Sequence, residues 1–306
     1  MKLLISFLMI FQMICTNVEF YGKSYIVYDS LNQYVVEGKN IDYLQSVASI
    51  SKIMTAIVVI ENSRLDKKIT VDETINKAYG SCVYIHIKDQ ITIQDLLYGL
   101  MLRSGNDCAL MLAKSVGGSV DRFVEMMNEK ARDIGMKQTH FSNPSGLDEE
   151  DEGNLSTVKE MAMLYRYCCQ NPLFNQIVKT KEYKRLDGKG YWHNKNRLLK
   201  EYPYCVGGKT GYTKKAKRTL ITRAIKKQVD LIIVTFNCGN DFEFHQKKYE
   251  ECFKNYEKLV LFDKGVRNIK GNWYLFENDL LMSKEKDESP SFYLAFGLLP
   301  GLLRLH

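Results

Sequence analysis

The sequence predicts an α+β domain in which one antiparallel sheet joins the first and last segments of the chain. Three observations support this fold class. Two β-rich runs flank a polar turn within residues 24–38, helix-type patterns follow from Ser49 to beyond Thr157, and three more β-rich runs lie between residues 206 and 237. Strands at both ends, with helices inserted between them, are typical of an α+β domain.

Residues 24–38 read as an opening hairpin because two β-rich runs surround the polar residues 29–33. From Ser49 the chain is apolar on nearly every side, which predicts a helix buried in the middle of the domain. Further helices are expected at residues 92–103, 107–116 and 120–134, the last ending at Gly135.

A capping box, Thr157 followed by Glu160, predicts the start of another helix. The β-rich part follows, with strands expected at 206–211, 218–224 and 229–237 and a closing helix at 242–262.

Beyond about residue 263 the composition shifts, and we expect a small β-rich C-terminal appendage over 263–306. It has an alternating strand at 272–276, a charge-rich run at 283–289 and a last apolar stretch at 291–306. That stretch is too short to span a bilayer. A peripheral membrane contact and a strand packed on the appendage both remain open.

The length and the charge of the chain argue against several classes of protein. With 306 residues, 45% of them hydrophobic, the chain can bury one sizeable core. Lys+Arg 43 against Asp+Glu 36 gives a formal charge of +7 without dense basic blocks, which argues against nucleic-acid binding and suits an anionic surface such as a cell envelope. A mean hydropathy of −0.27 argues against a polytopic membrane protein.

The N-terminal residues predict export. Lys2 is followed by an apolar run from Leu3 to Cys15, broken only by two polar residues, and this is the length of a signal-peptide core. We therefore expect a signal peptide at 1–19, a main domain at 20–262 and an extracytoplasmic location in the cell envelope. A buried N-terminal helix is the alternative.

Metal and cofactor chemistry is not expected. The eight cysteines have no disulfide-framework spacing and form no C-x-x-C pair, and the five histidines are scattered. We expect most thiols to be free and buried.

Three S-x-x-K patterns occur, at Ser49/Lys52, Ser156/Lys159 and Ser283/Lys286. The spacing places a hydroxyl and an amine on one helical face, where a desolvated lysine can accept the serine proton. Only Ser49 opens a thoroughly apolar helix, in which burial disfavours the charged amine of Lys52. The first pair is therefore the candidate nucleophile and base.

Two further motifs could complete a site. Ser104 and Asn106 flank a glycine between two predicted helices, so a hydroxyl for proton relay and an amide for substrate binding can point the same way. Lys209, Thr210 and Gly211 lie on a predicted strand. Because side chains alternate along a strand, Lys209 and Gly211 share one face, which offers an ammonium group and a backbone without a side chain. A P-loop is excluded because position 203 is Pro where that motif needs Gly.

The ordered set S-x-x-K, S-x-N and K-T-G is a signature of penicillin-binding proteins and class A β-lactamases. From about residue 24 to 260 the chain resembles the low-molecular-mass D-alanyl-D-alanine carboxypeptidases. The matching motifs are VASISKIMTA at 47–56, SGND at 104–107, NPSGL at 143–147, NKNRLL at 194–199 and GKTGYT at 208–213. The resemblance implies a β-lactamase/DD-peptidase-like domain, with helices flanking the sheet and a helical subdomain.

It also implies roles for the motif residues. Ser49 would be acylated, Lys52 would take its proton, Ser104 and Asn106 would serve relay and substrate binding, and Lys209 with Thr210 would hold a terminal carboxylate. The backbone N–H groups of Ser49 and of Tyr212, just after Gly211, would form the oxyanion hole. The implied partners are peptidoglycan stem peptides and, as covalent inhibitors, β-lactams.

Two positions depart from the family pattern, Lys217 where many relatives have Gly and Asn154 where a His is frequent. Two other functions remain open. A β-lactamase would need a glutamate-held water, and the acidic loop offers Glu149, Glu150 and Glu152 but no Glu-x-x-Leu-Asn pattern. A non-catalytic envelope-binding scaffold would keep the fold without the reaction.

Overall fold

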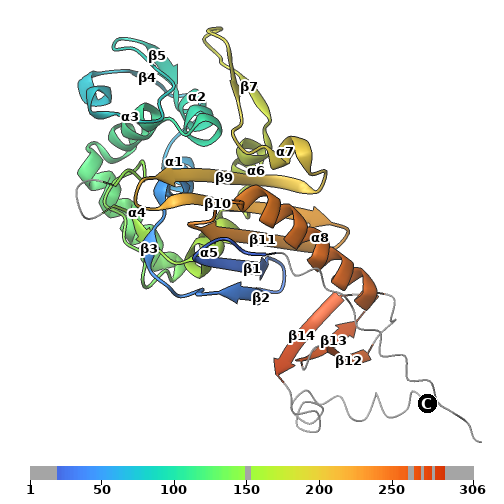
Figure 1. Cartoon of the computed structure of the whole chain (residues 1–306). Helices are drawn as coiled ribbons and strands as arrows, with labels where there is room; N and C mark the ends of the chain where they lie inside the picture. Colours follow the sequence, from blue (N-terminus) through green and yellow to red (C-terminus); the bar gives the residue numbers. More distant parts are fainter. Residues whose placement is uncertain (1–18, 149–152, 261–264, 270–271, 278–279, 287–306) are drawn as a thin grey trace, which may run out of the picture.

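The computed structural model describes residues 19–148, 153–260, 265–269, 272–277 and 280–286 (Figure 1). The expected signal peptide lies outside the described residues except for Glu19. The three glutamates of the acidic loop and the last apolar stretch, 291–306, also lie outside them.

A five-stranded antiparallel sheet forms the centre of the main domain, in the order β2-β1-β11-β10-β9. Its first strands, β1 (Ser24–Asp29) and β2 (Tyr34–Lys39), pair with β11 (Val229–Phe236) from the far end of the domain. Strands β10 (Lys217–Lys226) and β9 (Cys205–Thr213) complete it. The prediction that the sheet joins the first and last segments is confirmed.

Both faces of the sheet are covered, which explains why the inner strand β11 is apolar at most positions. Along β11, Ile232 and Val234 belong to the larger core with the inserted helices, whereas Ile233 faces the closing helix α8 (Asp241–Val260). In β1, Ile26 and Val27 divide in the same way, because successive side chains of a strand point to opposite faces. In Figure 1, α8 crosses one face and α5 lies behind the other.

The inserted segment is mainly helical. It contains η1 (Ala48–Ser51), α1 (Lys52–Asn62), η2 (Glu73–Lys77), α2 (Ile93–Tyr98), η3 (Gly99–Arg103), α3 (Asn106–Gly117), α4 (Val120–Ile134), α5 (Val158–Cys168), α6 (Pro172–Lys179) and α7 (Leu198–Glu201). Its short strands pair as β3 (Gln45–Ser46) with β6 (Leu155–Ser156), β4 (Lys68–Thr70) with β5 (Gln90–Thr92), and β7 (Glu182–Lys184) with β8 (Tyr191–His193).

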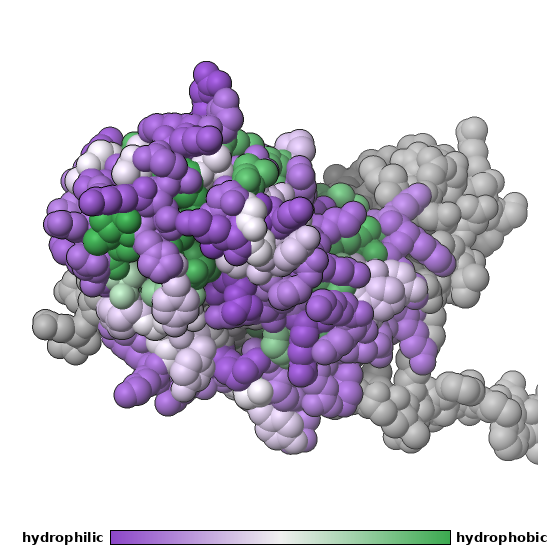
Figure 2. Space-filling model, turned by 90° about the horizontal axis from the view of Figure 1, so that it is seen from above, coloured by the Kyte–Doolittle hydropathy of each residue, from purple (hydrophilic) through white to green (hydrophobic). Residues whose placement is uncertain are grey.

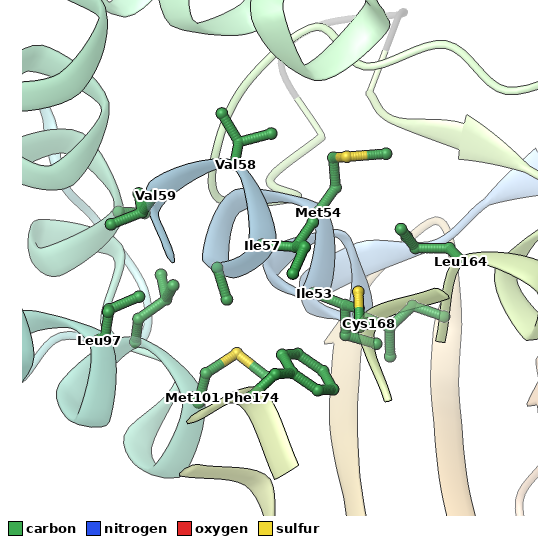
Figure 3. Packing of buried hydrophobic residues seen from close by; sticks show 14 of the residues in the cluster. Ile53, Met54, Ile57, Val58, Val59, Leu97, Met101, Leu164, Cys168 and Phe174 are labelled. Carbon is green, nitrogen blue, oxygen red and sulfur yellow. The ribbon is translucent and has the colours of Figure 1, made fainter. Parts of the chain in front are cut away.

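Helix α1 is enclosed on nearly every side, as its sequence predicts. Ile53 and Ile57 are at most 1% exposed, and Figure 3 shows them among side chains of neighbouring helices, including Phe174 of α6. Burying such a side chain contributes roughly 1.5–3 kcal/mol. This packing fixes the helix that carries the candidate nucleophile and base.

Several helix boundaries agree with the expectation and one differs. Helix α4 runs from Val120 to Ile134, with the Ser119 side chain accepting from the backbone N–H of Arg122, and Gly135 closes it at φ +87°. The helix expected over 92–103 changes after Tyr98 into one π-helical turn. Such turns accommodate a local irregularity and are frequent at functional sites.

Only half of the expected capping box forms. The Thr157 hydroxyl accepts from the backbone N–H of Glu160 at 3.1 Å, but the Glu160 carboxylate does not return to Thr157. It accepts instead from the backbone N–H of Gln138 and from the Thr139 hydroxyl, so the reciprocal bond was wrongly predicted. The tertiary contact competes for the same carboxylate and ties residues 138–139 to α5.

The C-terminal segment is β-rich. Strands β12 (Gly265–Ile269), β13 (Asn272–Glu277) and β14 (Leu280–Lys286) form a separate antiparallel sheet. The start of the charge-rich run therefore belongs to β14. The face in Figure 2 is mostly hydrophilic, with hydrophobic residues in several small groups. Among the described helices, none is both long and apolar enough to cross a bilayer.

Candidate active site

Ser49 and Lys52 meet where η1 passes into α1. The Lys52 Nζ atom donates to the Ser49 Oγ atom at 3.0 Å, with Ser49 half-buried and Lys52 completely buried. The preceding Ala48 has φ +51°, a left-handed conformation that is unfavourable for a residue with a side chain. The turn that presents Ser49 is therefore held in place by the surrounding packing.

Lys52 has two further acceptors. Its amine donates to the Asn106 Oδ1 atom at 2.7 Å and to the Ser145 backbone oxygen. Burial lowers the pKa of Lys52 to about 7, and the positive charge of Lys195 is the second cause. At neutral pH a large share of the amine is thus neutral and able to accept a proton.

Ser104 and Lys209 form a second hydroxyl–amine pair. The Lys209 Nζ atom donates to the Ser104 Oγ atom at 2.9 Å and to the Thr210 backbone oxygen at 2.7 Å. Ser104 follows the π-turn at φ +65°, and this turn directs it towards β9. Burial, followed by the charges of Lys52 and Lys195, lowers the pKa of Lys209 well below its ordinary value.

Asn106 is fixed by its neighbours so that its oxygen faces Lys52. Its Nδ2 group donates to the Tyr79 backbone oxygen, and its backbone N–H donates to the Ser81 oxygen at 2.7 Å. Residues 79–81 therefore hold the amide from the side opposite Lys52.

Gly211 allows β9 to lie directly against the candidate nucleophile. A Cβ atom at Gly211 would lie 3.0 Å from the Ser49 nitrogen and 2.4 Å from the Thr219 Oγ1 atom. Only glycine fits at this position. The next residue, Tyr212, pairs with Arg218 of β10 and has a side chain that is 63% exposed.

The structure thus links Ser49, Lys52 and Asn106 through side-chain hydrogen bonds, and Ser104 with Lys209 through another. Gly211 packs against Ser49, and Thr210 contacts Lys209 through its backbone oxygen. The second S-x-x-K pattern does not form a pair, because Ser156 contacts Thr139 and Lys159 contacts Asp42. The third pattern, at Ser283 and Lys286, lies on strand β14 and not on a helix.

The loop that supplies the Ser145 oxygen is one of the matching motifs, but no role for its residues was predicted from the sequence. Asn143 Oδ1 accepts from the backbone N–H groups of Ser145 and Gly146, and Asn154 Oδ1 accepts from that of Asn143 at 3.1 Å. Asn154, a departure from the family pattern, therefore has a structural role here. The turn formers at 143–146 signal a loop, but not that a backbone oxygen would face Lys52.

Comparisons with known proteins show the family of the chain. A family model described as D-alanyl-D-alanine carboxypeptidase matches residues 12–240. The chain belongs to this family. It is 31% identical over 255 residues to the D-alanyl-D-alanine carboxypeptidase DacF of Bacillus subtilis, a match that covers 80% of this chain and 65% of that relative's length.

Solved structures of the carboxypeptidase family confirm the fold class. The D-alanyl-D-alanine carboxypeptidase of Mycobacterium tuberculosis has a TM-score of 0.73 at 29% identity, covering 77% of this chain and 92% of that one. The Streptomyces K15 DD-transpeptidase has a TM-score of 0.70 at 28% identity, covering 77% and 98%. The α+β, DD-peptidase-like domain expected from the motifs is therefore the observed fold.

Proposed function

We propose that the protein is a serine-type D-Ala-D-Ala carboxypeptidase that removes the terminal D-Ala from peptidoglycan stem peptides. The observation that carries this proposal is the 3.0 Å contact between the Ser49 hydroxyl and a completely buried Lys52 amine. Membership of the carboxypeptidase family gives the substrate class.

Acylation begins when neutral Lys52 accepts the Ser49 proton and Oγ attacks the carbonyl carbon of the penultimate D-Ala. The negative charge on the carbonyl oxygen would be held by the backbone N–H groups of Ser49 and Tyr212. When the C–N bond breaks, the leaving amine of D-Ala takes a proton from the Ser104 hydroxyl, which contacts Lys209, and Ser104 regains a proton from the Lys52 ammonium formed in the first step. Water then hydrolyses the ester and restores Ser49.

Lys209 with Thr210 would bind the terminal carboxylate. Burial disfavours the ammonium form of Lys209. A carboxylate nearby has the opposite effect on its pKa, so substrate binding itself restores the charge that holds it. The same geometry makes β-lactams covalent inhibitors, since Ser49 would open their ring amide.

The location follows from the substrate. Stem peptides lie outside the cytoplasmic membrane, so an enzyme acting on them is exported, and the apolar run from Leu3 to Cys15 supports export. The membrane-surface contact expected for 291–306 stays a prediction.

Release of D-Ala from an acyl-D-Ala-D-Ala peptide tests the function. Wild type should release D-Ala, and Ser49→Ala should lower the rate by about 10³-fold or more because the nucleophile is lost. Ser156→Ala is the matched control, since it removes the serine of another S-x-x-K pattern, and it should retain activity. Equal rates for Ser49→Ala and wild type would refute the proposal.

A further inference from the structure

We propose that Lys195 is a positioning residue whose ammonium supplies the positive charge that keeps the Lys52 amine in its neutral, proton-accepting form. The inference rests on the proposed function, in which Lys52 is the base. It adds a residue to which that function assigned no role.

The chain fixes Lys195 at the edge of the site from both sides. Its backbone N–H donates to the Leu102 oxygen in the π-turn at 3.1 Å, and its Nζ atom donates to the Ser81 Oγ atom at 3.2 Å. The following residue, Asn196, is 2% exposed. The backbone oxygen of Ser81 also accepts from the backbone N–H of Asn106, the residue whose side chain binds Lys52. Ser81 therefore anchors both Lys195 and Asn106.

Three lysines from three different segments therefore face one site. Lys52 comes from α1, Lys209 from β9, and Lys195 from the connection between β8 and α7. When several amines interact, the one that water solvates best keeps its positive charge most readily. The charge is therefore more stable on the exposed Lys195 than on the buried Lys52 or Lys209.

Three other titratable groups act on Lys52 in the opposite direction. Asp107 on α3 and the thiols of Cys82 and Cys108 favour the protonated amine, but each of them acts less on its pKa than Lys195 does. The Asp107 carboxylate is occupied by the backbone N–H groups of residues 83 and 85. Partial burial, and after it the positive charge of Arg103, lower the pKa of Lys195 itself.

The test is the pH dependence of Ser49 acylation by a chromogenic β-lactam. In wild type the second-order rate should rise through a pH near 7, where Lys52 loses its proton. Removing the positive charge in Lys195→Met raises the pKa of Lys52, so the rising limb should move to higher pH by about half to one unit. At pH 6 the rate then falls about three- to tenfold, whereas at pH 9 it stays near that of wild type.

Further variants separate charge from structure. Lys195→Gln retains hydrogen-bonding capacity towards Ser81 and should show the same shift, while Lys195→Arg should restore the wild-type limb. Lys189→Met, a control that removes a charge paired with Asp89, should leave the limb in place.

Two results would overturn the inference. In the first, the rising limb of the pH profile of Lys195→Gln coincides with that of wild type. In the second, the acylation rates of Lys195→Met and Lys195→Gln fall by the same factor at every pH, as a merely structural role predicts. In either case wild type still acylates and the proposed function stands. A wild type that is not acylated at Ser49 at any pH would overturn both.

Discussion

Lys52→Met is expected to lower D-Ala release by about 10³-fold or more. Without the amine, Ser49 keeps its proton, and a neutral hydroxyl is a weak nucleophile. Methionine is unbranched and of similar length, so it can occupy the buried space that Lys52 leaves. The measurement is the steady-state rate on an acyl-D-Ala-D-Ala peptide at pH 8.

The fold should survive this change because two effects on stability oppose each other. Removing a buried amine removes its desolvation cost, but it leaves Asn106 Oδ1 and the Ser145 oxygen without their donor. Lys159→Met is the control, since Lys159 belongs to another S-x-x-K pattern and contacts Asp42. Activity of Lys52→Met within tenfold of this control, at an unchanged unfolding midpoint, would show that Lys52 is not the base.

Gly146→Ala is expected to lower the free energy of unfolding by about 3 kcal/mol or more. Gly146 has φ +77°, and an added Cβ atom would lie 2.0 Å from the Ala48 oxygen and 2.9 Å from the Ser51 Oγ atom. The clash is with backbone next to the nucleophile, so the loop or η1 must shift. Urea denaturation measures the loss, and the acylation rate should fall with it because the Ser145 oxygen moves.

Gly118→Ala is the matched control for this prediction. Gly118 also has φ +77°, but an added Cβ atom would meet nothing within 4 Å. Its alanine variant therefore carries only the left-handed strain, about 1–2 kcal/mol. If the two variants lose the same stability, the close packing of residues 143–147 on η1 is not what fixes the site.

The fold was predictable where the local pattern and the packing agree. The opening hairpin, the buried helix after Ser49 and the last three strands of the sheet follow from apolar periodicity that the sheet and helices then bury. The segment 171–193 was missed, although Asn171 before Pro172 is a helix-start signal that the structure bears out. Its hairpin strands are three residues each, too short for a periodicity to show.

The site residues were predictable only in part, for a physical reason. Side chains with a chemical signature, such as Ser49, Lys52 and Lys209, can be picked out by type and spacing. The Ser145 oxygen is a backbone group without such a signature, and the role that we propose for Lys195 depends on its position relative to Lys52, which only the fold determines. The Glu160 carboxylate was mispredicted for a related reason. Donors from residues 138 and 139 bind it in place of the backbone N–H of Thr157.

The most direct test of the account is the intact mass of the protein after brief exposure to benzylpenicillin, followed over time. We expect wild type and Ser156→Ala to gain one drug molecule and keep it, because in the proposed mechanism Lys52 activates only Ser49. Ser49→Ala should gain none. An adduct on Ser49→Ala, or none on folded wild type, would contradict the acyl-enzyme, and rapid loss of the wild-type adduct would indicate a β-lactamase instead.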